Sequence, residues 1–355
     1  MSAVQLEIEI TEALKRSDLL FIDVRTPDEY AEASIPGAVN IPLFDNREYH
    51  RLGIIYRQLG DAEARQAALM MAAPKLPALV EMIKKTCSPK KPLLYCSRGG
   101  LRSLSLSQIL ALAGIDSFRL KKGYKAYRGY VNNRLNDYNL TSRLFVVHGL
   151  TGVGKTAVLH KLEQRGVPVI DLEGLANHRG SVFGAIGLNA GRSQKDFDAL
   201  LLQQLDRFSD EPGLFIEGEG RRIGNIYLPS FLSEAMDRGL QILLSASMET
   251  RVARIVNTYI STTMSEELLE QLKDAVISLQ RRLGNKKVKL LTNMLEQGDF
   301  SRAVEILCAD YYDQFYSDSR PECSRFDIII DAENIEYAAG EIVKLAGRTV
   351  NNPEI

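Results

Sequence analysis

The sequence predicts an α/β protein with two domains, each built on a mostly parallel sheet. Three observations lead to this prediction. The chain has 355 residues, which is long for a single domain. Short apolar runs alternate with stretches of helical periodicity, the order expected when helices connect parallel strands. A polar, asparagine-rich stretch at 130–143 separates two such series. We therefore expect one domain at 1–135 and a second at 141–355.

The first series is expected to contain short buried strands joined by helices. Apolar runs predict strands at 18–24, 36–43 and 91–96. Helical spacing predicts helices at about 60–86 and at 103–114, where Gly114 is suited to end the second helix.

The second series has the same alternation and adds a long helical segment. Strands are expected at 143–149, 167–174, 213–220, 240–246 and 325–333. Helices are expected at 156–166, at 334–347 and over a mostly helical segment at about 248–318.

Composition is that of an ordinary globular protein, with 45% apolar and 25% charged residues. No apolar run approaches the length that spans a membrane, and the first residues, MSAVQLEIEITEALKR, lack the apolar stretch of a secretory signal. The four cysteines have no metal-ligand spacing and are too few for a disulfide scaffold, so we expect a cytoplasmic protein. A net charge of −1 leaves a nucleic-acid partner open.

The stretch YCSRGGLRS places Cys96 at the end of a predicted strand, just before a helix. A glycine-containing turn in this position directs backbone N–H groups inward and forms an anion site. Arg102, with Arg98, adds positive charge, so the field favours a nucleophilic thiolate. The predicted anion loop consists of Ser97, Arg98, Gly99 and Gly100. The other cysteines, Cys87, Cys308 and Cys323, lack this context and are expected to be structural.

The spacing C-x5-R is used both by sulfur-group transfer and by phosphate-ester hydrolysis. Upstream, FIDVRTPDEYAEASIPGAVNIPL at 21–43 resembles the first half of a rhodanese domain. LKKGYKAY at 120–127 resembles the segment that follows the active loop in that family, and Ser34 departs from a histidine common there. The resemblance implies that Cys96 carries sulfur, or selenium by analogy.

The stretch GLTGVGKT at 149–156 fits the phosphate-binding pattern G-x-x-x-x-G-K-[ST] between a predicted strand and a predicted helix. Its N–H groups are expected to wrap a diphosphate and Lys155 to neutralise it. The hydroxyl of Thr156 is expected to help bind Mg²⁺. The predicted diphosphate-binding residues are Gly149, Gly152, Gly154, Lys155 and Thr156.

Further polar residues follow the neighbouring strands, and ligands of open α/β sheets bind at these strand ends. No apolar run ending in aspartate marks a Walker B strand, so Glu217 is a candidate for that role. Asp171 is either a second acid or a helix cap. The predicted supporting residues are Asp171, His178, Arg179, Glu217, Arg221 and Arg222.

Two basic stretches are candidates for contact with RNA. RLKKGYKAYRGY at 119–130 interleaves basic residues with Tyr124, Tyr127 and Tyr130, a pattern that suits phosphate contacts and base stacking. RRLGNKKVK at 281–289 is the second. Either stretch is equally compatible with a solvated face. The predicted RNA-binding residues are Lys121, Lys122, Lys125, Arg128, Arg281 and Arg282.

Taken together, the stretches IDVRTPDEY, LGIIYRQLG, YCSRGGLRS, GLTGVGKT, DLEGLANHRGSVFG, EGEGRRIG and ADYYDQFY resemble the tRNA 2-selenouridine synthase family. The resemblance implies a rhodanese-like parallel-sheet domain followed by a P-loop NTPase-like α/β domain with a helical insertion. It implies a transferase that acts on tRNA with 2-thiouridine at the wobble position. Geranyl diphosphate and selenophosphate would be its other substrates, and Cys96, Arg102 and Lys155 its catalytic residues.

Three alternatives stay open. A small-molecule kinase fused to a sulfurtransferase is suggested by ILLSASMETRVARIV at 242–256, which resembles nucleotide kinases. A tyrosine-phosphatase-like hydrolase would use Cys96 and Arg102 and leave the phosphate loop without a role. A regulator that binds RNA without catalysis would tolerate loss of Cys96 and Lys155.

Overall fold

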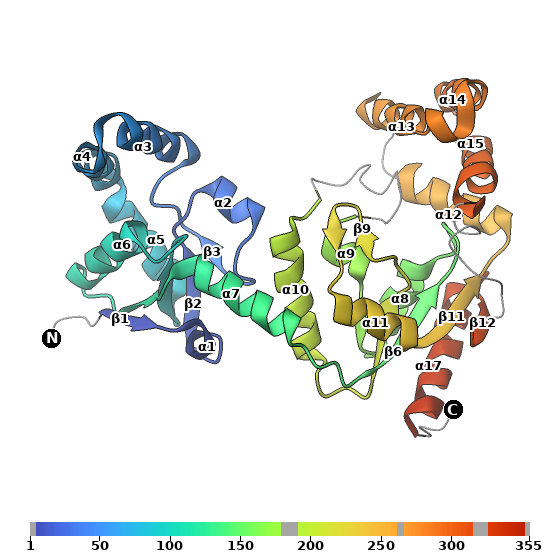
Figure 1. Cartoon of the computed structure of the whole chain (residues 1–355), viewed down its shortest axis with the longest axis horizontal. Helices are drawn as coiled ribbons and strands as arrows, with labels where there is room; N and C mark the ends of the chain where they lie inside the picture. The colour runs from blue at the N-terminus through green and yellow to red at the C-terminus, as the bar shows by residue number, and fades with distance from the viewer. Residues whose placement is uncertain (1–4, 179–190, 261–265, 315–325, 352–355) are drawn as a thin grey trace. The chain divides into compact units, whose positions relative to one another are not determined.

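The computed structural model describes residues 5–178, 191–260, 266–314 and 326–351 (Figure 1). The chain divides into two compact units. The first is Met1–Asp137 with Lys195–Leu202, and the second is Tyr138–Gln194 with Gln203–Ile355. Arg179 and Cys323, which the sequence analysis singled out, lie outside the described residues.

The first unit is built on a parallel five-stranded sheet in the order β1-β5-β4-β2-β3. Its strands are β1 (Gln5–Ile8), β2 (Leu19–Asp23), β3 (Val39–Asn40), β4 (Lys91–Tyr95) and β5 (Ser117–Leu120). Leu93, Leu94 and Tyr95 in the central strand β4 are fully buried, as expected for a strand covered on both faces. The chain leaves β4 at Cys96.

Helices cover this sheet and enclose its core. They are α1 (Ile10–Ala13), α2 (Pro27–Glu32), α3 (Asn46–Leu59), α4 (Asp61–Ala72), η1 (Ala73–Lys75), α5 (Leu76–Cys87), α6 (Leu101–Leu112) and α7 (Gly123–Asn136). In α5, Leu79, Ile83 and Cys87 recur every four residues and share one buried face. The predicted helices at 60–86 and 103–114 are confirmed as α4, η1, α5 and α6.

The second unit has a parallel five-stranded sheet in the order β12-β11-β6-β8-β7. Its strands are β6 (Arg143–His148), β7 (Val169–Ile170), β8 (Gly213–Glu217), β11 (Leu240–Ser245) and β12 (Ile328–Asp331), and β9 (Arg222–Ile223) pairs with β10 (Ile226–Tyr227) in a separate antiparallel hairpin. The helices that accompany them are α8 (Lys155–Gln164), α9 (Leu172–Ala176), α11 (Ser230–Arg238) and α17 (Ile335–Asn351). Of α10 (Gln194–Arg207), the residues Lys195–Leu202 belong to the first unit. The α/β class predicted for both units is therefore confirmed.

The predicted helical segment at 248–318 is also present. It contains α12 (Met248–Ile260), α13 (Glu266–Ser278), α14 (Gln280–Glu296), α15 (Phe300–Leu307) and the π-helix η2 (Cys308–Tyr312). Figure 1 shows α13, α14 and α15 gathered beside α12. Val276, Leu291 and Cys308 are fully buried in a separate core of this segment, which stabilises it independently of the sheet.

Two predicted strands are shorter than expected. Only Val39–Asn40 of the stretch 36–43 pairs with β2, because its two prolines have no N–H to donate to a ladder. Only Val169–Ile170 of the stretch 167–174 is a strand. Asp171 ends it by accepting a hydrogen bond from the N–H of Gly174 and so beginning α9.

Candidate functional site

The structure places Cys96 in a turn between β4 and α6, which we call the cysteine loop (residues 96–102). The thiol is only 3% exposed. Its Sγ accepts a hydrogen bond from the N–H of Gly100 at 3.2 Å and lies 3.3 Å from the Ser103 hydroxyl. Gly100 immediately precedes α6, so the sulfur lies at a helix N-terminus, where partial positive charge stabilises an anion.

The beginning of α7 holds the cysteine loop from the other side. The N–H of Tyr124 donates to the carbonyl of Cys96 at 2.8 Å, and the N–H of Lys125 donates to that of Ser97 at 3.0 Å. Gly123 permits this approach: a Cβ there would lie 2.1 Å from the Cys96 carbonyl oxygen, and its φ of +57° disfavours other residues. These contacts fix both carbonyls on α7.

Arg102 contacts Glu29 and Ser97. Its guanidinium donates to the two carboxylate oxygens of Glu29 at 2.5 and 3.1 Å and to the Ser97 hydroxyl at 2.8 Å. Burial alone raises the pKa of Glu29, but the hydrogen bonds from Arg102 and Ser97 outweigh it and lower that pKa to about 2. Glu29 is therefore ionised at neutral pH and offsets most of the Arg102 charge that the sequence analysis assigned to the thiolate. Arg98 is exposed.

The two other described cysteines lie in helices and not in a strand-to-helix turn, since Cys87 ends α5 and Cys308 begins η2. Burial raises the pKa of the Cys87 thiol and of the Cys308 thiol to about 11. Both side chains pack within hydrophobic cores, Cys87 under β4 and Cys308 among the helices after α12. Their surroundings fit the structural role predicted for them.

The second site is the turn between β6 and α8, which we call the phosphate loop (residues 149–156). The strand–loop–helix context that the motif requires is therefore present. Gly149, Gly152 and Gly154 all have positive φ, and a Cβ on Gly152 would lie 2.8 Å from the Arg251 carbonyl oxygen. Lys155 Nζ donates to the carbonyl of Gly149 at 3.1 Å and so lies across the loop.

Two arginines of α12, which the sequence analysis did not assign to the site, bind the phosphate loop. Arg251 Nε donates to the carbonyl of Thr151 at 2.9 Å, and Arg254 Nη1 donates to that of Val153 at 2.6 Å. Buried Arg251 also forms a bidentate ion pair with Asp313, just after η2, at 2.9 and 2.6 Å. The helical segment thus fixes the loop backbone before a ligand binds. The sequence signal that could have identified them is a pair of arginines three residues apart on a helix that follows a buried strand.

Glu217 ends β8 and is fully buried beside the phosphate loop. It accepts hydrogen bonds from the Thr156 hydroxyl at 3.2 Å and from the N–H of Glu173 at 3.0 Å. Burial raises the pKa of Glu217 well above its usual value, and the charges of Glu173 and Asp171 raise it further. Glu217 therefore lies where the missing Walker B aspartate was expected to be.

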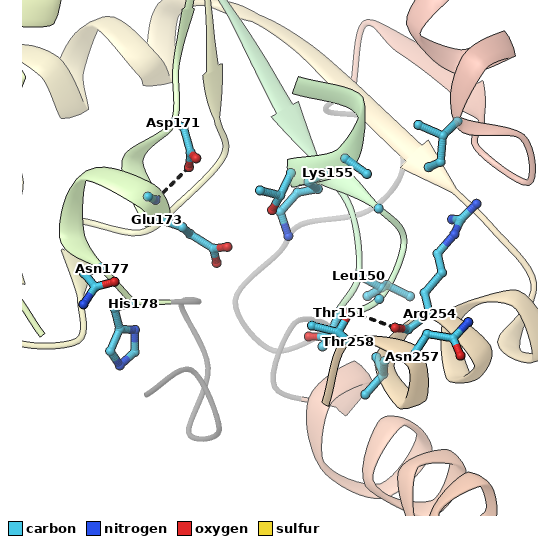
Figure 2. Close-up of a pocket in the computed structure, with 17 residues that line it drawn as sticks. Leu150, Thr151, Lys155, Asp171, Glu173, Asn177, His178, Arg254, Asn257 and Thr258 are labelled. Carbon is cyan, nitrogen blue, oxygen red and sulfur yellow. Dashed lines mark hydrogen bonds between the residues drawn. The ribbon is translucent and has the colours of Figure 1, made fainter. Parts of the chain in front are cut away.

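A cavity of about 640 Å³ opens beside the phosphate loop. Figure 2 shows Asp171, Glu173, Asn177 and His178 along one side and Arg254, Asn257 and Thr258 along the other, with Lys155 between them. Burial lowers the pKa of His178, which favours its neutral form. Apolar side chains also line the cavity: Leu150, Ala157, Ile255 and Ile335.

The structure does not bring Arg221 and Arg222 to this cavity. Neither is among the described residues that line it. Both are exposed at the hairpin of β9 and β10, where Arg222 donates to the carbonyl of Gly224 at 2.6 Å and to the Asn225 side chain at 3.1 Å. Gly224 of the same hairpin nevertheless lies against the ring of His178, which lines the cavity, so the predicted supporting role of the two arginines stays a prediction. Arg179 lies outside the described residues, so its predicted role stays a prediction.

The predicted RNA surface on α7 is only partly available. Tyr124 and Tyr127 are buried, and burial raises the pKa of Tyr124 to about 12. The Arg25 guanidinium lies 4.1 Å from the Tyr124 ring. These two rings cannot stack on a base, because the helix presents them to the core. The basic residues remain partly or fully exposed: Lys121, Lys122, Lys125 and Arg128 on or next to α7, and Arg281 and Arg282 on α14.

The described residues provide neither a metal-ligand cluster nor a membrane-spanning helix. Within the described parts of the chain, no three His, Cys, Asp or Glu side chains are arranged to hold a metal ion by themselves. No helix in those parts is long and apolar enough to cross a membrane. A divalent cation at the phosphate loop would therefore need oxygen ligands from its substrate as well as from Thr156 and the nearby carboxylates.

Comparison with known families gives matches for both units. Residues 142–336 match the family described as the tRNA 2-selenouridine synthase AAA domain. Residues 8–130 match the family described as the rhodanese-like domain. Together these two matches cover most of the chain.

Individual relatives match over nearly their whole length. A tRNA 2-selenouridine synthase of Cupriavidus necator is 34% identical over 334 residues, covering 86% of this chain and 89% of that protein. One of Cupriavidus pinatubonensis is 34% identical over 324 residues, covering 83% and 87%. One of Pseudomonas syringae pv. syringae is 31% identical over 366 residues, covering 94% and 95%.

Proposed function

The chain belongs to the tRNA 2-selenouridine synthase family, and from this premise we propose how its two sites divide the reaction. It is a transferase that modifies tRNA to contain 2-selenouridine. We propose that its substrate nucleoside is the wobble 2-thiouridine. A geranyl group is first transferred to the sulfur, and selenium from selenophosphate then replaces geranylthiol. The domain of residues 141–355 performs the geranyl step and the domain of residues 1–135 the selenium step.

The observation that carries this proposal is the mixed lining of the 640 Å³ cavity. Its phosphate loop, with Lys155 and the N-terminus of α8, suits a diphosphate. Leu150, Ile255 and Ile335 on the same cavity suit a short isoprenoid chain. Geranyl diphosphate has both features in one molecule.

In the geranyl step, the bond from geranyl carbon to diphosphate oxygen breaks and a bond from that carbon to the uridine sulfur forms. Lys155 and the loop N–H groups stabilise the negative charge that develops on the departing diphosphate. Thr156, Glu217 and Glu173 would hold Mg²⁺ together with water and substrate oxygens, since the Thr156 hydroxyl lies 3.2 Å from the Glu217 carboxyl group and a divalent cation there would favour its ionised form. Mg²⁺ would supply further charge neutralisation at the leaving group.

In the selenium step, a bond from selenium to uridine C2 forms as geranylthiol leaves, and the phosphoryl group of selenophosphate passes to water. We assign the handling of selenium to Cys96. Its sulfur lies at the N-terminus of α6 and accepts a hydrogen bond from the Gly100 N–H at 3.2 Å, so the selenide released when selenophosphate loses its phosphoryl group would meet the same partial positive charge. Arg102 acts as a positioning residue through Ser97 and Glu29. Lys121, Lys122, Lys125, Arg128, Arg281 and Arg282 are proposed to contact the tRNA phosphates.

Nucleoside mass spectrometry tests the two-step route. The full chain is incubated with 2-thiouridine-containing tRNA, Mg²⁺ and geranyl diphosphate, and selenophosphate is added to one half before digestion. We expect geranylated 2-thiouridine in the first half and 2-selenouridine in the second. A parallel incubation receives selenophosphate but no geranyl diphosphate, and selenouridine formed there at the same rate would overturn the geranyl step. Unchanged 2-thiouridine together with ATP turnover would favour the kinase alternative.

A further inference from the structure

Helix α3 exposes two aromatic side chains, Tyr49 and Tyr56. None of its fourteen residues is fully buried, and half-buried Leu52 packs it against the core of the first unit. A helix on a globular domain normally buries one apolar face. Here Tyr56 is 58% exposed and Tyr49 is 42% exposed. Tyrosines left in solvent on one helix indicate a surface that binds something else.

The two rings border a groove of about 530 Å³, which we call the α3 groove. Tyr49 and Tyr56 are seven residues apart, so they lie on the same face of the helix about 10 Å apart along its axis. Gly53 lies between them, and a Cβ built on it meets no atom within 4 Å. Two tyrosine rings therefore line the groove, and the helix residue between them has no side chain to fill it. The residues that line it are Thr26, Asp28, Asn46, Tyr49, His50, Gly53, Tyr56 and Arg57.

The α3 groove is continuous with the cysteine loop. The Arg102 guanidinium lies 4.4 Å from the centre of the Tyr49 ring while its nitrogens bind Glu29 and Ser97. Thr26, which lines the groove, caps α2 by accepting a hydrogen bond from the N–H of Glu29. A ligand in the groove would therefore lie beside the same residues that position the loop of Cys96.

The charges of α3 favour an anionic ligand. The helix carries three arginines, Arg47, Arg51 and Arg57, and they are exposed together with His50. Its one acidic residue, Glu48, is paired with Lys75 at 2.5 Å. Asp28 is the only acidic side chain among the residues that line the groove. Aromatic faces beside arginines are the combination with which proteins bind unstacked nucleotides.

We propose that the α3 groove binds a base of the tRNA anticodon loop next to the nucleotide that enters the site of Cys96. The inference rests on the proposed function, since it uses the same RNA substrate. Tyr56 stacks on the base, Tyr49 closes the other end of the groove, and Arg57 contacts the adjoining phosphate. The groove thereby places the target uridine at the cysteine loop.

Binding of an anticodon stem-loop RNA to the full chain, followed by fluorescence anisotropy, tests the proposal. Tyr56→Ala is expected to raise Kd roughly 5- to 100-fold, the range given by loss of one base–aromatic stack. Tyr56→Phe keeps the stacking surface and should restore affinity. Arg57→Ala should lower the slope of log Kd against log salt by about one. Tyr337→Ala is the matched control, because Tyr337 is also 58% exposed but lies on α17.

Cross-linking with the same RNA carrying 5-iodouridine beside the wobble position gives a second measurement. Cross-links at Tyr56 or Tyr49 are expected. Unchanged Kd for Tyr56→Ala together with cross-links elsewhere would overturn the groove assignment and leave α3 as a protein-binding surface. If those two results are found while the wild-type chain modifies tRNA in the nucleoside mass spectrometry assay, the proposed function stands and this inference fails.

Discussion

The cysteine loop and the phosphate loop are two versions of one backbone arrangement. Each connects a central parallel strand to a helix, and each has its carbonyls bound from outside. The N–H groups at the start of α7 bind the carbonyls of Cys96 and Ser97, whereas Arg251 and Arg254 bind those of Thr151 and Val153. When the loop carbonyls are bound by a neighbouring helix, the loop N–H groups can point toward the centre of the loop, where an anion binds.

The two loops differ in charge and space. At the cysteine loop, Glu29 offsets the charge of Arg102, and the thiol is buried. At the phosphate loop, Lys155 lies on a cavity of about 640 Å³. The first loop therefore suits a small anion such as selenide, and the second suits a large anion. The comparison teaches that the surroundings of such a turn, rather than its backbone, decide its ligand.

The largest expected effect separates the two loops by chemistry. Lys155→Ala should reduce geranyl transfer roughly 100- to 1,000-fold, because it removes charge stabilisation at the leaving diphosphate. Cys96→Ser should spare geranyl transfer and block selenouridine formation. Nucleoside mass spectrometry measures both. Lys161→Ala on the same helix, where Lys161 pairs with Glu336, is the control for lost charge. Normal geranyl transfer by Lys155→Ala would contradict the proposal that the phosphate loop binds the diphosphate.

A second prediction concerns the support of the cysteine loop. Gly123→Ala should lower the free energy of unfolding by about 2 kcal/mol or more, because its Cβ would lie 2.1 Å from the Cys96 carbonyl oxygen. Selenium incorporation should fall with it. Gly129→Ala on the same helix meets no atom within 4 Å and should instead be neutral or stabilise by up to about 1 kcal/mol. Equal urea midpoints for the two variants would show that α7 does not hold the loop.

The corresponding change at the phosphate loop is Arg251→Lys. Lysine cannot bind Asp313 at two points and the Thr151 carbonyl at once, so the loop should lose order. We expect stability to fall by about 1–3 kcal/mol and the affinity for geranyl diphosphate to fall about 10-fold. Calorimetric titration measures the affinity, with exposed Arg302→Lys as the control. Unchanged affinity would mean that the loop is ordered without α12.

The smallest expected effect is the pH dependence of the Glu29 contacts. The pKa of Glu29 is lowered from 4.5 to about 2, so its contribution to stability is present above pH 4.5 and is lost as the pH falls toward 2. The difference in unfolding free energy between wild type and Glu29→Gln should therefore shrink over that range. Urea unfolding at a series of pH values measures it. A constant difference would show that the contacts with Arg102 and Ser97 do not lower the pKa of Glu29.

Much of the molecule was predictable because the signals are local. Period and length of apolar runs gave the strands that flank both loops, and the order of the motifs indicated the family to which the chain belongs. The short strands β1 and β5 were missed, since four residues give too little periodicity to separate strand from loop. The length of the strand at 36–43 was overestimated, because the prolines in this apolar stretch cannot donate hydrogen bonds to a neighbouring strand.

What the sequence by itself determined is the chemistry at each turn: a cysteine before a glycine-containing loop, and the glycines, lysine and threonine of a phosphate loop. These patterns act through the local backbone, so neighbouring residues suffice to specify them. Only the tertiary structure decided which distant groups reach them. Arg251 meets Thr151, Asp313 meets Arg251, Glu29 meets Arg102, and Tyr124 turns inward while Tyr56 stays exposed. Contacts across a hundred residues depend on how helices pack on the sheets, and no local spacing encodes that packing.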